Sequence, residues 1–201
     1  MEIKLTKIPR NPIIVDGFPG FGMVGAIAAE FLIQHLKTEQ IGKIVVEQSP
    51  AITAIHEGKL LEPFGIFYNK RYNIVIVHAL APSQGHEWEL AGALIKLSKQ
   101  MNAKEIISLE GVGSMAETGN KTFYYATAAA NESKFKKLGM NPLDEGIILG
   151  ITAAILTKAE KIPISCIFAE AHTNLPDSKA AAKIIESLDK YLGLNVDYKP
   201  L

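Results

Sequence analysis

The sequence has few of the residues that build disulfides, metal sites and phosphate contacts. It contains one cysteine, Cys166, which excludes an internal disulfide and a cysteine-based metal site. Arginine occurs only at positions 10 and 71, so few side chains can hold a phosphate through two parallel hydrogen bonds. The 21 basic residues equal the 21 acidic ones, so no net field attracts nucleic acid or an anionic membrane. We therefore expect no metal site, and neither nucleic acid nor a membrane as a partner.

The sequence also has no long hydrophobic run, and its first residues do not show the pattern of a signal peptide. No apolar run reaches the roughly 18–20 residues that a membrane-spanning helix needs. The first ten residues, MEIKLTKIPR, lack the apolar centre of a signal peptide. A chain of 201 residues, 48% hydrophobic and 21% charged, suits one ordinary globular domain. We expect a single α/β domain over residues 1–201, in the cytoplasm.

Apolar stretches rich in β-branched residues alternate with helical patterns along the chain. Strands are predicted in PIIVDG, KIVVEQ, YNIVIVHAL, EIISLEG, KTFYYATAA and ISCIFAEA, a hairpin over 51–69, and helices over 21–37, 86–101, 131–138, 143–158 and 177–191. Continuous apolar strands separated by helices are typical of a parallel sheet covered on both faces. The predicted fold class is α/β, a three-layer αβα sandwich with a mostly parallel, partly mixed sheet.

The segment VDGFPGFGMVG, residues 15–25, contains the spacing G-x-G-x-x-G between a strand and a helix. This spacing is typical of dinucleotide-binding loops, where the first glycine directly follows the strand. Here Gly20 comes several residues later, Pro19 offers no N–H to a phosphate, and Phe18 and Phe21 would crowd a pyrophosphate. We expect no cofactor. The glycines would instead permit a sharp, closely packed turn, or a rigid loop that presents both phenylalanines to another subunit.

Two of the predicted helices are apolar around most of their circumference. They lie in MVGAIAAEFLIQHL and GIILGITAAILTKA. A helix of this kind must be covered on two sides, whereas an ordinary surface helix buries only one stripe. We expect the sheet on one side and a second subunit on the other; the alternative is a cover from the same chain. The predicted oligomer or partner interface comprises Phe18, Phe21, Met23, Ile27, Phe31, Ile148, Ile151 and Ile155.

Four segments, in this order, resemble the proteasome assembly chaperone family in its archaeal branch. They are GFPGFGMVG, EGVG, DEGIILGITAAIL and AEAHTNLPDSKAAAKIIE, and the resemblance extends over residues 11–190. It implies a fold like that of the nucleoside phosphorylases, assembly into a homo-oligomer, and no demonstrated catalysis. The partners that it implies are proteasome α-subunits or a paralogous family member.

Members of this family that assist assembly of the proteasome α-ring end in a hydrophobic residue, a tyrosine and any last residue. This sequence ends NVDYKPL, with Tyr198 earlier than that pattern requires and Pro200 in the penultimate place. We therefore expect this tail not to dock on the proteasome. An assembly of its own, or one with a paralogue, then becomes a plausible role beside binding to α-subunits.

The alternative function is an enzyme with its site at the carboxyl ends of the strands, where ligands bind in parallel sheets. The candidate catalytic residues there are Ser83, His86, Glu110, Glu170 and His172. A carboxylate and a histidine suit acid–base chemistry, and the fold analogy would indicate a small-molecule hydrolase or a phosphorylase-like enzyme. Ser83, however, lacks the G-x-S-x-G turn that exposes a nucleophile, and His86 suits the start of a helix. A non-catalytic protein is therefore expected.

Overall fold

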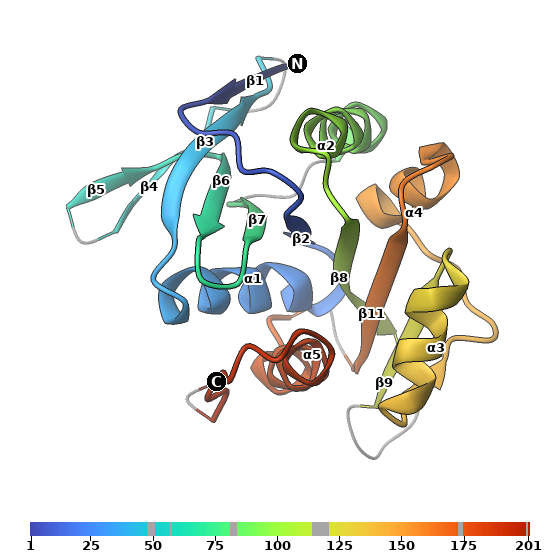
Figure 1. Ribbon diagram of the computed structural model, residues 1–201. Coiled ribbons are helices and arrows are strands. Elements are labelled where there is room, and N and C mark those ends of the chain that lie inside the picture. The colour runs from blue at the N-terminus through green and yellow to red at the C-terminus, as the bar shows by residue number, and fades with distance from the viewer. Residues whose placement is uncertain (48–50, 57, 81–83, 114–120, 173–174, 200) are drawn as a thin grey trace.

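A nine-stranded sheet forms the centre of the molecule (Figure 1). The computed structural model describes residues 1–47, 51–56, 58–80, 84–113, 121–172, 175–199 and 201. The strands of this sheet are Glu2–Leu5 (β1), Ile13–Gly17 (β2), Glu39–Val45 (β3), Phe64–Asn69 (β6), Ile74–Ala79 (β7), Glu105–Gly113 (β8), Thr122–Ala126 (β9), Asn141–Pro142 (β10) and Ile164–Ala171 (β11). They lie in the order β1-β3-β6-β7-β2-β8-β11-β9-β10.

The four central strands, β7, β2, β8 and β11, are parallel. Antiparallel pairs join β1, β3, β6 and β7 on one side, and β9 to β11 on the other, while the short β10 runs parallel to β9. The predicted mixed sheet is confirmed, with its parallel part in the centre. Because these strands are parallel, their carboxyl ends lie along one edge, where ligand sites of such sheets form.

Helices cover both faces of the sheet, which confirms the three-layer α/β architecture. They are Val24–His35 (α1), Glu87–Met101 (α2), Ala129–Lys137 (α3), Gly150–Lys158 (α4) and Ser178–Leu192 (α5). α2 packs on α4 at one face and α1 on α5 at the other (Figure 1). Successive strand residues point to opposite faces, so Ile106 belongs to the core under α2 and α4, and Ile107 to the core under α1 and α5.

Two predicted helices begin later than their apolar patterns suggest. The first is preceded by a 3₁₀ turn, Phe21–Met23 (η1), and α1 starts at Val24. Gly22 and Met23 have φ angles of 63° and 51°, which interrupt a right-handed helix. The helix predicted over 143–158 starts only at Gly150, whose φ of 70° is likewise left-handed. The apolar residues before Gly150 therefore form a non-helical segment, 143–149.

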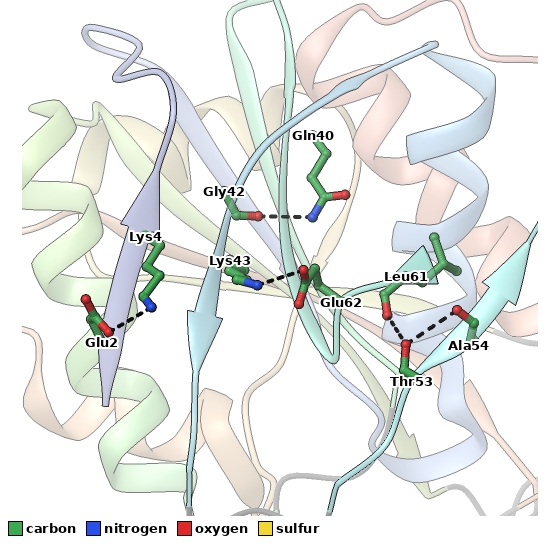
Figure 2. A network of polar contacts seen from close by, with 9 residues as sticks. All are labelled: Glu2, Lys4, Gln40, Gly42, Lys43, Thr53, Ala54, Leu61 and Glu62. Carbon is green, nitrogen blue, oxygen red and sulfur yellow. Dashed lines mark hydrogen bonds and ion pairs between the residues drawn. The ribbon is translucent and has the colours of Figure 1, made fainter. Parts of the chain in front are cut away.

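The predicted hairpin over 51–69 divides into two parts. Ala54–His56 (β4) and Lys59–Leu61 (β5) form a separate two-stranded sheet that projects from the body, and the remainder becomes β6 (Figure 1). An isolated two-stranded hairpin is only marginally stable. Figure 2 shows the contacts at its base: Lys43 Nζ lies 2.8 Å from Glu62 Oε1, and Thr53 Oγ1 donates to the Leu61 carbonyl at 2.7 Å. The ion pair ties the hairpin to β3, and the Thr53 hydrogen bond closes the base of the hairpin itself.

A stack of three aromatic rings fixes α3 and α5 to the sheet. The ring of Phe135 lies between those of Tyr124 and Tyr191, with centroid distances of 4.7 and 4.1 Å. Phe135 is fully buried. Its ring is therefore the main apolar contact of the short helix α3.

We predict that Phe135→Ala lowers the free energy of unfolding by about 3–5 kcal/mol, because it leaves a cavity between two tyrosines. Urea unfolding of the purified protein measures this loss. Lys137→Ala, at an exposed position of the same helix, should change it by no more than about 0.5 kcal/mol. A loss below about 1 kcal/mol for Phe135→Ala would show that α3 does not depend on this stack.

Candidate functional site

A pocket of about 1070 Å³ opens at the carboxyl ends of the central strands. The loop after β2, the ends of β8 and β11, the start of α2, segment 143–149 and the start of α4 line it. Its large apolar residues include Phe18, Phe21, Met23, Phe123, Ile148 and Ile151. Its charged residues are Glu87, Glu110, Glu145 and Glu170. The described lining residues include no basic side chain, and no serine, threonine, cysteine or tyrosine.

The glycines of segment 15–25 allow this loop to lie directly against β8. A Cβ on Gly20 would come within 1.9 Å of Glu110 Oε1, and one on Gly111 within 2.1 Å of the Phe21 carbonyl oxygen. The backbone N–H of Phe21 hydrogen-bonds to the Glu110 carboxylate. In a dinucleotide-binding loop a phosphate takes this place at the start of the helix. Here the chain's own Glu110 carboxyl group occupies this place and accepts the N–H that a phosphate would need, which argues against a dinucleotide.

A chain of hydrogen bonds connects two buried carboxyl groups beneath the pocket. Ser108 Oγ lies 2.9 Å from Asp16 Oδ1 and 2.8 Å from Thr152 Oγ1, and Thr152 Oγ1 lies 3.1 Å from Glu110 Oε2. If both acids were ionised, each hydroxyl would donate to its own carboxylate, and no proton would lie between the two hydroxyl oxygens. If one acid is protonated, it donates to the neighbouring hydroxyl, and each hydroxyl then donates to the next group along the chain. The donors point towards Asp16 when Glu110 carries the proton, and towards Glu110 when Asp16 carries it. The geometry therefore favours one shared proton.

Burial disfavours the ionised forms of both acids. It raises the pKa of Asp16 to about 7, although the hydrogen bond from Ser108 opposes the shift. It also raises the pKa of Glu110 to about 8; the Thr152 hydrogen bond lowers this pKa and the charge of Asp16 raises it. Burial, followed by the charges of Asp16 and Glu110, holds the pKa of the Cys166 thiol well above its ordinary range. The thiol is therefore unreactive at neutral pH.

The candidate catalytic residues do not come together as one set. Glu110 and Glu170 both line the pocket, and Glu170 Oε2 accepts a hydrogen bond from the Lys121 N–H at 3.1 Å. His86 precedes α2, with its Nδ1 3.6 Å from Glu89 Oε2, and is not among the described lining residues. His172 is exposed just after β11. Ser83 lies outside the described residues.

The eight predicted interface residues fall into two groups. Phe18, Ile151 and Ile155 are buried within the single chain, and α2 packs over α4. The second cover of α4 at these positions thus comes from the same chain, which was the alternative expectation. The five others, all partly exposed, are Phe21, Met23, Ile27, Phe31 and Ile148.

Two exposed aliphatic residues beside the pocket were not predicted from the sequence. Ile147 and Leu149 are 88% and 74% exposed and lie in segment 143–149. The apolar pattern assigned them to a helix, which hid their exposure. Ser108 and Thr152 were missed as well, although Ser108 lies two residues before Glu110 and hence on the same face of its strand.

Neither metal ligands nor membrane-spanning helices are found in the described ranges. No group of three or more His, Cys, Asp or Glu residues is placed there to hold a metal ion. No helix in these ranges is long and apolar enough to cross a membrane.

Comparison with known proteins gives one family and several relatives. A sequence model of the PAC2 family matches residues 14–201. Pyrococcus furiosus PbaA, described as an archaeal homolog of proteasome-assembly chaperone, matches with a TM-score of 0.88 and 30% identity, over 99% of this chain and 89% of that one. P. furiosus PbaB, described as an archaeal proteasome activator, has the same fold, with a TM-score of 0.82 and 22% identity over 99% and 91% of the two chains. A protein of Methanocaldococcus jannaschii is 28% identical over 96% of this chain and 80% of its own length.

The raised pKa values predict that stability falls as pH rises. Between about pH 4.5 and 8 the folded chain keeps at least one proton on the pair Asp16 and Glu110 that the unfolded chain has released, because the pKa values are about 7 and 8 when folded and ordinarily 3.8 and 4.5. The free energy of unfolding should then fall by at least about 2 kcal/mol from pH 5 to pH 9, relative to the variant Asp16→Asn/Glu110→Gln. Urea unfolding at pH 5, 7 and 9 measures the difference.

Two controls make this measurement specific. The buried His78 has a lowered pKa, chiefly from burial, and contributes a rise in stability with pH up to its ordinary value of 6.5. The variant retains His78, so subtraction removes this contribution. Glu160→Gln, at an exposed position, should reproduce the wild-type profile. Parallel profiles for wild type and double variant would mean that both carboxyls are ionised at pH 7.

Proposed function

The chain belongs to the PAC2 family, and on that premise we propose that it is a non-catalytic, self-assembling protein that binds protein partners as an assembly chaperone. The observation that carries the proposal is an apolar rim on the pocket. We define this rim as the partly exposed Phe21, Met23 and Ile148 together with the exposed Ile147 and Leu149.

Exposure of the apolar rim to water is unfavourable in free energy. Burying one large aliphatic side chain is worth roughly 1.5–3 kcal/mol, and Ile147 and Leu149 are almost fully accessible. Contiguous apolar surface around a concave site is typical of protein–protein contacts. A second copy of the chain, or a partner protein, would cover this surface.

The lining of the pocket supports a binding role over a catalytic one. The observation that favours an enzyme is Glu110, whose pKa of about 8 would let it act as a general acid. Among the described residues of the lining, however, no hydroxyl, thiol, imidazole or amine accompanies Glu110, and only the carboxyl groups of Glu87, Glu145 and Glu170 could act as its base. A hydrolase or phosphorylase-like activity therefore remains the second candidate.

The relatives suggest the class of partner. PbaA, 30% identical over nearly all of this chain, is described as a homolog of a proteasome-assembly chaperone. We assign proteasome α-subunits as the first candidate partner, a paralogous PAC2 protein as the second, and the cytoplasm as the compartment.

Self-assembly is tested by the mass of the purified chain. We predict an oligomer by multi-angle light scattering at micromolar concentration, and a shift towards monomer in Ile147→Ser/Leu149→Ser, because the variant loses the apolar area of the rim. The matched control is Ile55→Ser/Leu60→Ser, which removes two exposed aliphatic residues from the hairpin. A monomeric wild type would refute self-assembly. Dissociation of the hairpin variant alone would move the interface away from the pocket.

The partner is tested by reconstitution. We predict that the chain, mixed with purified proteasome α-subunits of its own organism, co-elutes with them on size exclusion and increases the yield of α-rings. Ile147→Ser/Leu149→Ser should lose this effect, and the hairpin variant should keep it. If the wild-type chain elutes separately and leaves ring yield unchanged, the proteasome is not its partner.

A further inference from the structure

We propose that Glu110 in the pocket, which hydrogen bonds through Thr152 and Ser108 connect to the buried Asp16, receives a basic side chain, so that the pocket takes a partner segment carrying lysine or arginine between apolar residues. This inference rests on the proposed function as a protein-binding molecule. It adds the chemistry by which a partner is recognised.

The charged residues described in the lining of the pocket are all acidic. Glu87, Glu110, Glu145 and Glu170 line it, Asp16 lies below Glu110, and no described lining residue is basic. The Oδ2 atom of Asp16 is buried and accepts no hydrogen bond among the described residues. A cation in this pocket would meet four acidic lining residues, and no described lining residue would compete with it as a positive charge.

Most of the remaining lining is apolar and suits apolar residues that flank a basic residue in a partner segment. Phe18, Phe21 and Ile148 border the same cavity as Glu110, and aromatic faces also attract cations. A lysine or arginine side chain has an apolar stem that packs on such surfaces while its charged end reaches a polar group. The pocket therefore matches a segment in which one basic residue is flanked by apolar ones.

The size and rim of the site favour a protein segment over a small amine. The pocket measures about 1070 Å³, and Ile147 and Leu149 stand exposed beside it. A small amine would fill part of this volume and leave the apolar rim in water. A peptide segment would fill the pocket and cover the rim in one contact.

Binding of a cation should expel the shared proton. A positive charge next to Glu110 favours its ionised form, and the Ser108 and Thr152 hydroxyls then each donate to their own carboxylate. Asp16 on β2 and Cys166 on β11 interact electrostatically with Glu110. Glu87 on α2, Glu145 in segment 143–149 and Glu170 on β11 line the same pocket. Affinity for a basic segment should therefore rise from pH 6 to pH 9, with protons released at the lower pH values.

The test uses two labelled peptides of opposite charge. Fluorescein-Leu-Lys-Leu-Leu-Lys-Leu-amide and its counterpart with glutamate in place of lysine are titrated with the full chain by fluorescence anisotropy. We expect the lysine peptide to bind at least tenfold more tightly at pH 7. Calorimetry in two buffers of different ionisation enthalpy should report proton release with the lysine peptide at pH 7 and little at pH 9.

Glu110→Gln is the decisive variant, because glutamine has the shape of the protonated acid that the resting site holds and so permits folding. It should weaken the lysine peptide at least tenfold and abolish proton release, while Glu160→Gln should change neither. Asp16→Asn, the second variant, should reduce proton release. Circular dichroism and the Tm of each variant check that the fold is retained.

Three results would overturn the inference: equal affinity for both peptides, an unchanged affinity in folded Glu110→Gln, or binding of n-hexylamine with the same Glu110 dependence while the lysine peptide fails to bind. The last result would assign the site to small amines. Failure of the inference is distinguishable from failure of the proposed function, because assembly through the rim is measured separately with Ile147→Ser/Leu149→Ser. If that variant assembles normally, the rim is not an interface, whatever the peptides do.

Discussion

The close approach of the glycine loop to strand β8 is the contact on which the site depends. A Cβ on Gly25 would come within 2.1 Å of the Leu109 carbonyl oxygen, and one on Gly111 equally close to that of Phe21. Larger residues would force η1 and α1 away from the sheet. With glycine at both places, the Phe21 N–H reaches the Glu110 carboxylate, and the start of α4 brings Thr152 to its other side. The G-x-G-x-x-G spacing thus serves backbone packing, and the group that accepts the Phe21 N–H is a carboxyl of the protein itself.

Asp16 and Glu110 are two neighbouring acids for which the described part of the chain supplies no basic partner. Such a pair is unusual in a protein interior, because a buried, unpaired charge is strongly disfavoured. The chain solves the problem with hydroxyls and a proton. Ser108 and Thr152 satisfy one oxygen of each carboxyl, and a single retained proton completes the connection between them. Such an arrangement is stable while the acids stay partly protonated, yet it changes charge readily near neutral pH. Its position at the floor of an open pocket, where a partner's charge can act on it, makes this property usable.

The sequence predicted elements well where one pattern dominated. Strand β11 occupies the predicted run ISCIFAEA without change, and α5 begins after Asp177, whose side chain accepts the Ala180 N–H as an N-cap. The start of α4 could not be predicted, because its apolar residues continue through Gly150, where a left-handed φ interrupts the helix. That error concealed the exposed segment 143–149.

The sequence predicted the position of Glu110 in the candidate site, but not the groups to which it is connected. Strand ends and residue types placed Glu110 at the correct edge of the sheet, because parallel strands direct their carboxyl ends to one side. The groups connected to it by hydrogen bonds belong to other elements: Asp16 comes from β2 and Thr152 from α4, and their meeting depends on how those elements pack.

Hydrophobic rims give affinity but discriminate poorly, whereas a buried charge rejects any partner that leaves it uncompensated. An assembly chaperone must release its partner after use. A charged contact that gains or loses a proton near neutral pH allows the affinity for that partner to change while the apolar surface around the contact stays the same.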